Sequence, residues 1–296
     1  MASRATILVG LFLCWGVWGM VGCASRPVVD EGSSQRLVGP EPSAAGEGET
    51  LRESDGVAQD EPASRSIFEE CIELGESTEG RLIEAYILGN GPEVTLVLAT
   101  IHGNEPAGTP LCFYLLDHLR EQPKLLADRR IIIVPVANPD GYAAGTRYNV
   151  NGIDLNRNFP APNRTRRTAH GPEALSEIES LHIHNLILEY APTRIISLHQ
   201  PLACIDYDGP IESLAHRLAE LSGLPVKKLG GLPGSLGSFA SMELGIGIIT
   251  FELPRNAHRR SAQELWQHYG DAMIESITFR EGAVLTAEVE PRMNAN

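Results

Sequence analysis

The residues best suited to chemistry in this sequence are polar side chains that directly follow apolar runs. His102 and Glu105 stand three positions apart, just after the apolar run 94–99, in the stretch Thr-Ile-His-Gly-Asn-Glu. His199 ends another such run, Arg-Ile-Ile-Ser-Leu. Catalytic zinc is usually held by three protein ligands drawn from histidine and carboxylate side chains, with water in the fourth position. The sequence therefore offers His102, Glu105 and His199 as candidate ligands of one zinc ion.

Glu252 follows a third run of the same kind, Ile-Ile-Thr-Phe. A carboxylate in such a place is costly unless it is paired or functional. Beside a zinc site, Glu252 could take a proton from the attacking water and hand it to the leaving amine. The alternative is an ion pair at the strand end with one of the nearby arginines, Arg255, Arg259 or Arg260.

A loop-like segment between residues 147 and 160 carries Arg147, Asn156 and Arg157 among several asparagines. Its arginines could bind a substrate carboxylate, and one could stabilise a developing oxyanion. Without the other motifs, solvated surface arginines would be the simpler interpretation.

The spacing of apolar residues predicts the elements that must position these side chains. Strands are expected at 81–88, 93–99, 131–136, 193–198 and 246–251, and helices at 106–120, 172–190, 211–222 and 262–277. Strands that alternate with helices favour a sheet covered on both faces. Because such sheets carry their sites at the ends of the strands, the four candidate residues should meet at one edge.

The N-terminus is similar to a bacterial lipoprotein signal. Arg4 precedes an uncharged apolar run from 5 to 21, and the small residue Gly22 precedes Cys23. We expect residues 1–23 to be a signal peptide, with Cys23 lipidated. The protein would then be exported and held at a membrane by the lipid, on a periplasmic or cell-surface face. An uncleaved membrane helix and a standard signal cut elsewhere are the alternatives.

The remaining chain divides by composition. Residues 24–65 are rich in acidic and small residues and should form a disordered linker, although a pro-segment has a similar composition. The catalytic domain is expected at 66–280, followed by a tail at 281–296. The net charge of −14 argues against a nucleic-acid partner. Cys71, Cys112 and Cys204 lack metal-binding spacing, and either one disulfide or buried thiols would suit them.

Five motifs together resemble those of the zinc metallocarboxypeptidases, in the same order along the chain. They are His102-x-x-Glu105, Asn138-Pro139-Asp140-Gly141, Asn156-Arg157-Asn158-Phe159, the strand-end His199 and Thr250-Phe251-Glu252-Leu253. The resemblance implies a three-layer α/β/α sandwich around a mixed sheet of about eight strands. It also implies zinc ligation by His102, Glu105 and His199, with Glu252 as the general base. Asn156 and Arg157 would grip a substrate carboxylate, and Arg147 would bind the oxyanion.

Segments 197–205 and 233–238 are similar to the murein peptide amidase branch of that family. This implies hydrolysis of the γ-D-glutamyl–meso-diaminopimelate bond in cell-wall peptides, with Ser235 lining the substrate site. Two features depart from the pattern. That branch is usually cytoplasmic, whereas this chain carries an export signal, and the mobile tyrosine of pancreatic-type carboxypeptidases has no counterpart in 229–247.

Two other functions fit parts of the sequence. N-acyl-amino-acid deacylases of the aspartoacylase and succinylglutamate desuccinylase type also use His-Gly-Asn-Glu and Asp-Leu-Asn-Arg segments, both present here. The Asn-Pro-Asp-Gly and Thr-Phe-Glu-Leu segments favour the peptidase. A non-catalytic lipoprotein that binds the cell wall and keeps a zinc site is the third possibility.

Overall fold

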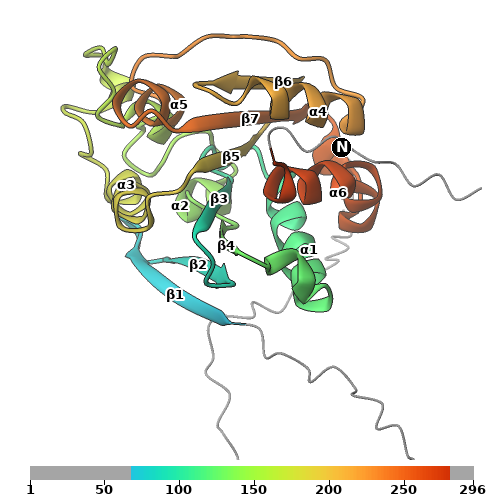
Figure 1. The fold of residues 1–296 in the computed structure, drawn as a ribbon. Coiled ribbons are helices and arrows are strands. Elements are labelled where there is room, and N and C mark those ends of the chain that lie inside the picture. The colour runs from blue at the N-terminus through green and yellow to red at the C-terminus, as the bar shows by residue number, and fades with distance from the viewer. Residues whose placement is uncertain (1–67, 281–296) are drawn as a thin grey trace, which may run out of the picture. The chain divides into compact units, whose positions relative to one another are not determined.

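The computed structural model of the chain describes residues 68–280 (Figure 1). The expected signal peptide with Cys23, the linker at 24–65 and the tail at 281–296 lie outside the described residues. Of the helices between residues 68 and 280, none has the length and apolar character needed to cross a bilayer.

A mixed sheet forms the centre of this part of the chain. Its strands are β1 (Glu69–Glu76), β2 (Leu82–Leu88), β3 (Glu93–Ala99), β4 (Arg129–Val134), β5 (Arg194–His199), β6 (Leu202–Asp208) and β7 (Gly247–Pro254). They lie in the order β1-β2-β4-β3-β5-β7-β6. β4, β3, β5 and β7 are parallel to one another, while β2 and β6 run antiparallel to their neighbours β4 and β7. The mixed sheet is confirmed, with seven strands in the described part where about eight were expected.

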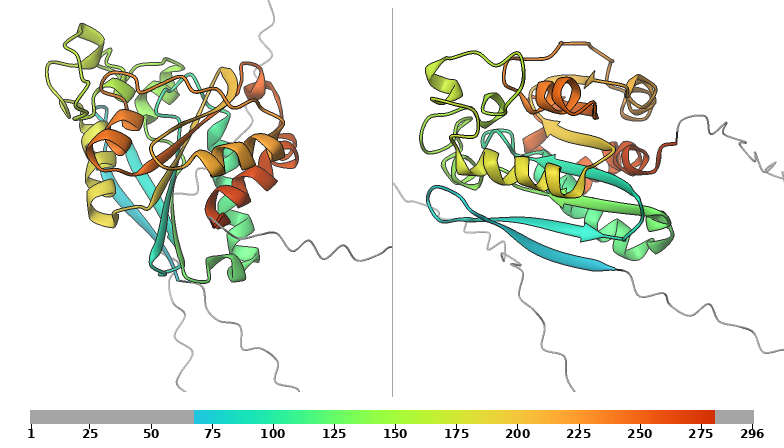
Figure 2. Two further views of the ribbon diagram at one scale, coloured as in Figure 1. Left: turned by 45° about the horizontal axis from the view of Figure 1, so that its top comes forward. Right: turned by 60° about the vertical axis from the view of Figure 1, so that its left-hand side comes forward.

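Helices cover both faces of the sheet, as Figures 1 and 2 show. α1 (Gly108–Glu121), α4 (Glu212–Ser222) and α6 (Ala262–Thr278) contribute to one hydrophobic core. α3 (Ile178–Tyr190) and the short α5 (Leu236–Ser238) contribute to a second core on the other face. α2 (Pro139–Ala144) follows β4. Short helical turns complete the described part at Pro123–Leu126, Leu155–Arg157, Thr168–His170, Phe239–Glu243 and Ala257–Arg259. The expected three-layer sandwich is confirmed.

The central strands β3, β5 and β7 lie side by side and position the candidate site residues. Each is almost entirely buried, which is why its sequence is a near-continuous apolar run rather than an alternating one. The three strands are parallel, so their carboxyl ends meet at the same edge. That edge receives His102 and Glu105 after β3, His199 from β5 and Glu252 from β7.

The helix expected at 172–190 begins only at Ile178, which corrects the prediction. Four of the six residues before it are hydrogen-bonded to Asn158 instead. Its carbonyl oxygen accepts a hydrogen bond from the Leu175 amide at 2.7 Å, and its Oδ1 accepts one from the Glu177 amide at 3.1 Å. Leu175 adopts a positive φ of 58°, which a regular helix does not contain. Long-range hydrogen bonds thus override the local helical pattern.

Two of the cysteines are now assigned. Cys112 and Cys204 are free, buried thiols. A disulfide between them, or from either of them to Cys71, is therefore excluded. Burial raises the pKa of both thiols, most strongly for Cys112, so neither is set up as a reactive thiolate.

Candidate active site

The turn after β3 brings His102 and Glu105 together. The amide of Glu105 donates to the carbonyl oxygen of His102 at 3.0 Å, closing a tight turn. The turn is followed by α1, which starts at Gly108 against β5. A Cβ at Gly108 would lie 2.7 Å from Cβ of Leu198, so only glycine lets the helix begin this close to the strand.

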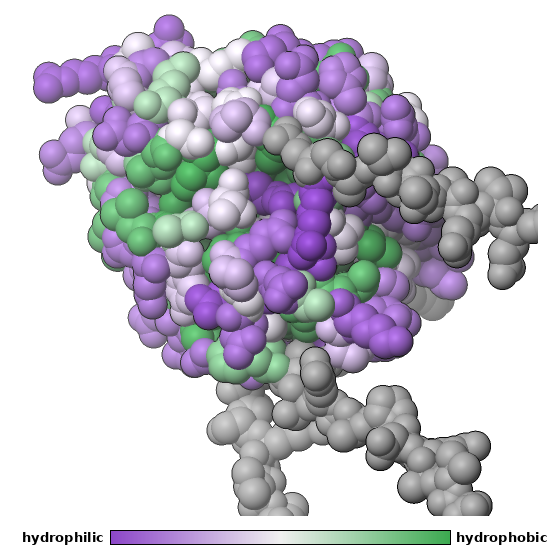
Figure 3. Space-filling model, viewed as in Figure 1, coloured by the Kyte–Doolittle hydropathy of each residue, from purple (hydrophilic) through white to green (hydrophobic). Residues whose placement is uncertain are grey.

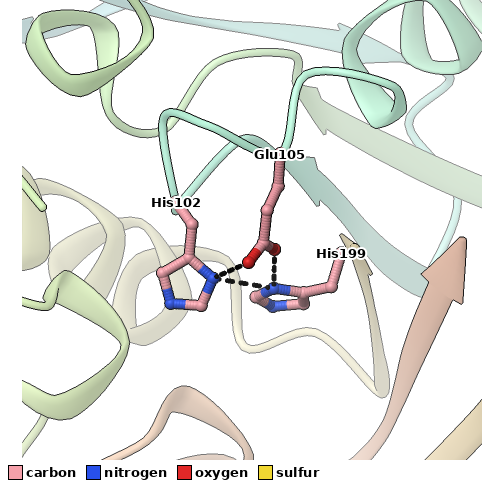
Figure 4. A group of neighbouring side chains, drawn as sticks. All are labelled: His102, Glu105 and His199. Carbon is pink, nitrogen blue, oxygen red and sulfur yellow. Dashed lines mark hydrogen bonds and ion pairs between the residues drawn. The ribbon is translucent and has the colours of Figure 1, made fainter. Parts of the chain in front are cut away.

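His199, the last residue of β5, completes the group (Figure 4). Nδ1 of His102 lies 2.9 Å from Oε1 of Glu105, and Nδ1 of His199 lies 2.9 Å from Oε2. The two Nδ1 atoms are 3.2 Å apart. All three residues are buried, with exposures of 3%, 5% and 3% in chain order. The structure thus brings together two histidines that are 97 positions apart in the sequence, with Glu105 between them.

This donor set fits zinc. Two imidazole nitrogens and one carboxylate are a ligand set that zinc enzymes use, and a fourth position remains for water. Zinc bonds of 2.0–2.2 Å in a tetrahedron separate ligand atoms by roughly 3.3–3.6 Å, and the spacings here, 2.9 to 3.2 Å, are a few tenths of an ångström shorter. Within residues 68–280 this is the one group of three or more such side chains with the geometry for a metal ion.

Hydrogen bonds among these buried side chains shift the pKa values of Glu105 and His102. Burial alone would raise the pKa of Glu105, but hydrogen bonds from His102 and His199 outweigh it and hold that pKa well below its ordinary value. Burial would lower the pKa of His102, but contacts with Asp154 and Glu105 raise it. The carboxylate of Glu105 is therefore ionised, as a metal ligand must be.

The opposite nitrogens of the two imidazoles are also occupied. Nε2 of His102 lies 3.0 Å from Oδ1 of Asp154, and Nε2 of His199 lies 3.0 Å from Oγ of Ser197. Partners of this kind orient the ring of a metal-binding histidine. Neither Asp154 nor Ser197 was singled out in the sequence, although Asp154 stands two residues before Asn156 in the same motif.

Glu252 lies on β7 beside His199. The two residues are paired across the parallel strands β5 and β7. Glu252 is 7% exposed, and its Oε2 accepts a hydrogen bond from the Leu202 amide at 3.2 Å. Burial raises its pKa, partly offset by His199 and by that hydrogen bond. No ion pair with Arg255, Arg259 or Arg260 forms among the described residues, which removes the alternative interpretation of Glu252.

Arg147 reaches the edge of the same group. Its Nη1 lies 3.1 Å from Oε1 of Glu105, and its Nη2 lies 3.0 Å from Oδ2 of Asp154. The side chain is 33% exposed, so the guanidinium is accessible while two carboxylates hold it in place. Its predicted role as the oxyanion-binding arginine stays a prediction.

Asn156 and Arg157 stand in a helical turn that follows Asp154. Oδ1 of Asp154 accepts a hydrogen bond from the Asn156 amide at 3.0 Å. The Arg157 guanidinium donates to the carbonyl oxygen of Asn156. Burial lowers the pKa of Arg157, with a partial opposing effect from Asp154, and an arginine in that state remains protonated near neutral pH. A partly buried cation here suits a substrate carboxylate.

The 233–238 loop packs against this turn. The amide of Phe159 donates to the carbonyl oxygen of Gly234 at 3.0 Å. Gly234 has a φ of +70°, and a Cβ there would lie 2.4 Å from the carbonyl oxygen of Arg157. Ser235, predicted to bind substrate, is buried and caps α5 by accepting a hydrogen bond from the Ser238 amide at 3.0 Å. Its hydroxyl is therefore used within the loop.

Comparisons with known proteins agree with this geometry. A family model described as zinc carboxypeptidase matches residues 59–207. Murein peptide amidase A of Escherichia coli strain K12 is 36% identical over 180 residues, which cover 55% of this chain and 72% of that protein. Carboxypeptidase M of Mus musculus is 32% identical over 138 residues, or 39% of this chain and 31% of that protein.

Solved structures agree as well. The murein-tripeptide amidase of Escherichia coli O157 is similar over 72% of this chain and 93% of its own, with 28% identity and a TM-score of 0.56. Carboxypeptidase A of Helicoverpa armigera is similar over 71% of this chain and 68% of its own. Its identity of 21% and TM-score of 0.56 support the fold alone.

Proposed function

This chain belongs to the zinc carboxypeptidase family, and from that premise we propose that it hydrolyses an amide bond in the peptides of cell-wall murein. The observation that carries the proposal is the convergence of His102, Glu105 and His199 beside Glu252. The similarity to murein peptide amidase A over 72% of that protein's length supports the substrate class. The bond we propose is the one between γ-D-glutamate and meso-diaminopimelate.

His102, Glu105 and His199 would hold the zinc ion. When bound there, zinc supplies Lewis-acid activation of water and of a carbonyl group. Glu252 then takes a proton from the attacking water and delivers it to the nitrogen of the leaving amine. Its burial raises its pKa above the ordinary value, which favours the protonated form that must deliver the proton.

Arg147 and the Asn156–Arg157 pair would handle the substrate's charges. Arg147 presents its guanidinium to the carbonyl oxygen as negative charge develops there. Arg157 and Asn156 bind a carboxylate on the diaminopimelate side, which sets the scissile amide against Glu252. Ser235 would act by shaping the 233–238 loop beside that carboxylate.

The experiment that tests the proposal is digestion of purified muropeptides by the zinc-loaded full chain, with products identified by mass spectrometry. Release of a diaminopimelate-containing fragment is expected, together with loss of activity after chelation and recovery on adding zinc. Cleavage of N-succinyl-glutamate without muropeptide cleavage would favour the deacylase alternative. Zinc binding without any turnover would favour the non-catalytic lipoprotein.

We also propose that the protein is exported and held at a membrane by a lipid on Cys23. The supporting observation is the short basic start, uncharged apolar run and Gly22-Cys23 junction. Changing Cys23 to Ser should move the protein from the membrane fraction to the soluble fraction and abolish incorporation of labelled fatty acid. Cys14→Ser, in the same segment, is the matched control and should leave both unchanged.

A further inference from the structure

The two histidines of the site are supported by chemically different side chains. Nε2 of His102 lies 3.0 Å from the carboxylate oxygen Oδ1 of Asp154, whereas Nε2 of His199 lies 3.0 Å from the hydroxyl of Ser197. Both supports are buried, with exposures of 6% for Asp154 and 2% for Ser197. The two histidines are therefore supported differently, His102 by a carboxylate and His199 by a hydroxyl.

The support of His102 can act in only one way. A carboxylate accepts hydrogen bonds and cannot donate, so when a cation takes the Nδ1 lone pair of His102, the ring proton is on Nε2 and Asp154 accepts it. Asp154 is itself held by Arg147 at 3.0 Å and by the amide of Asn156 at 3.0 Å. His102 is thus preset for metal binding by an ionic network.

The support of His199 comes from the same strand. Ser197 precedes His199 by two positions on β5, so both side chains point to the same face of the sheet. β5 lies between β3 and β7, with Ser197 paired to Leu98 on one side and Thr250 on the other. The sheet therefore fixes where the Ser197 hydroxyl stands. Among the described residues, Ser197 is the one hydrogen-bond partner of His199 Nε2.

We propose that Ser197 is a positioning residue of the zinc centre. Its hydroxyl accepts a hydrogen bond from Nε2–H of His199, which directs the Nδ1 lone pair toward the cation beside Glu105. The inference rests on the zinc site of the proposed function, but it does not depend on which amide is cleaved. Since a hydroxyl can also donate, Ser197 holds His199 less firmly than Asp154 holds His102. Because the Ser197 hydroxyl is the one hydrogen-bond partner of His199 Nε2 among the described residues, zinc retention should be sensitive to its loss.

A pair of variants of equal shape isolates the hydroxyl. Ser197→Thr keeps it, and Ser197→Val replaces it by a methyl group at the same place; both residue types suit a strand. The readout is the zinc dissociation constant of the full chain, measured by competition with a chelator and without substrate. We expect Ser197→Val to weaken zinc binding by about 10- to 100-fold and Ser197→Thr to stay within about threefold of the wild type.

Ser197→Ala keeps the test decisive if the added methyl group disturbs the strand in both variants. It removes the hydroxyl without adding bulk, and weakened zinc binding in this variant would still support the proposal. Thermal unfolding of each variant shows whether the fold is retained. Wild-type zinc affinity in folded Ser197→Ala or Ser197→Val would overturn the proposal. If zinc affinity depends on Ser197 but the wild-type chain leaves muropeptides intact, the proposed amidase activity is refuted and the positioning role of Ser197 is not.

Discussion

Asn156 is hydrogen-bonded through its side-chain oxygen to the loop beside it, because its Oδ1 accepts from the Leu236 amide at 2.9 Å. A backbone N–H can only donate, so the amide oxygen of Asn156 must face Leu236. The NH₂ group is then the part left for a substrate carboxylate. One side chain thus joins the 233–238 loop to the predicted carboxylate site.

This relationship predicts different effects for two substitutions of Asn156. Asn156→Asp keeps an acceptor for Leu236 but loses the donor and adds a negative charge, so stability should be retained while KM rises. Loss of one hydrogen bond to a charged group, about 1.5–3 kcal/mol, corresponds to a decrease in kcat/KM of roughly 10- to 100-fold. Asn156→Ala should lose a comparable amount and also unfold more easily. Steady-state kinetics and thermal unfolding check both, and a wild-type KM in Asn156→Asp would contradict the carboxylate-binding role.

Glu252→Gln should leave zinc binding intact and stop turnover. The amide has nearly the same shape, but it cannot accept the proton of the attacking water, so kcat should fall by roughly 10²–10⁴-fold or more. Zinc content and kcat are measured on the same preparation. Glu189→Gln, the same change at an exposed residue of α3, is the control and should behave as wild type. Undiminished hydrolysis by Glu252→Gln would refute its assignment as the general base.

Arg147→Lys should lower kcat far more than it changes KM. Lysine keeps the positive charge but loses the planar fork with which Arg147 contacts Glu105 and Asp154. Loss of a donor to a developing oxyanion costs roughly 10²–10³-fold in kcat. Arg166→Lys, at an exposed arginine, is the matched control. If Arg147→Lys altered only the zinc dissociation constant, the arginine would support Glu105 rather than the oxyanion.

Asp140 makes the stability of the protein depend on pH. Its buried carboxylate accepts hydrogen bonds from Ser77 Oγ at 2.7 Å, Arg81 Nη1 at 2.6 Å and the Glu79 amide at 2.9 Å. Burial would raise the pKa of Asp140, but these hydrogen bonds and the charge of Arg81 lower it. The lowered pKa stabilises the fold above about pH 4, and this contribution is lost as the pH falls through the pKa of the folded state.

Asp140→Asn should therefore destabilise the protein by about 1–2 kcal/mol at pH 7 and by less at pH 3. Urea unfolding at the two pH values measures the difference. A destabilisation of the same size at both pH values would contradict the charge-based explanation and indicate a purely steric effect.

The site was predictable from sequence where one buried strand carries one polar residue to the sheet edge. This holds for His199 and Glu252, and for His102 and Glu105 just after β3, because each of these polar side chains follows an apolar run closely in the sequence. Asp154 and Ser197 were missed because their role appears only in space. Asp154 stands among other polar loop residues, and Ser197 is a small residue inside an apolar run.

Strands and helices were likewise predicted where a local apolar pattern marks them and missed where it does not. Buried strands such as β3 were found because both of their faces are apolar. The edge strand β1 carries four glutamates and the edge strand β6 carries two aspartates, and neither sequence has a clear period of two. The irregular segment before α3 depends on Asn158, which is 17 residues from Leu175, so no local pattern could reveal it.

The adjacency of β3, β5 and β7 has a consequence for how the enzyme fails. His199 and Glu252 lie on strands from the middle of the sheet, and His102 and Glu105 lie in the tight turn that directly follows a third such strand, β3; interior strands do not fray as edge strands do. Heating should therefore abolish activity and melt the protein core in a single step, with no temperature at which the body of the protein survives but its cation has escaped.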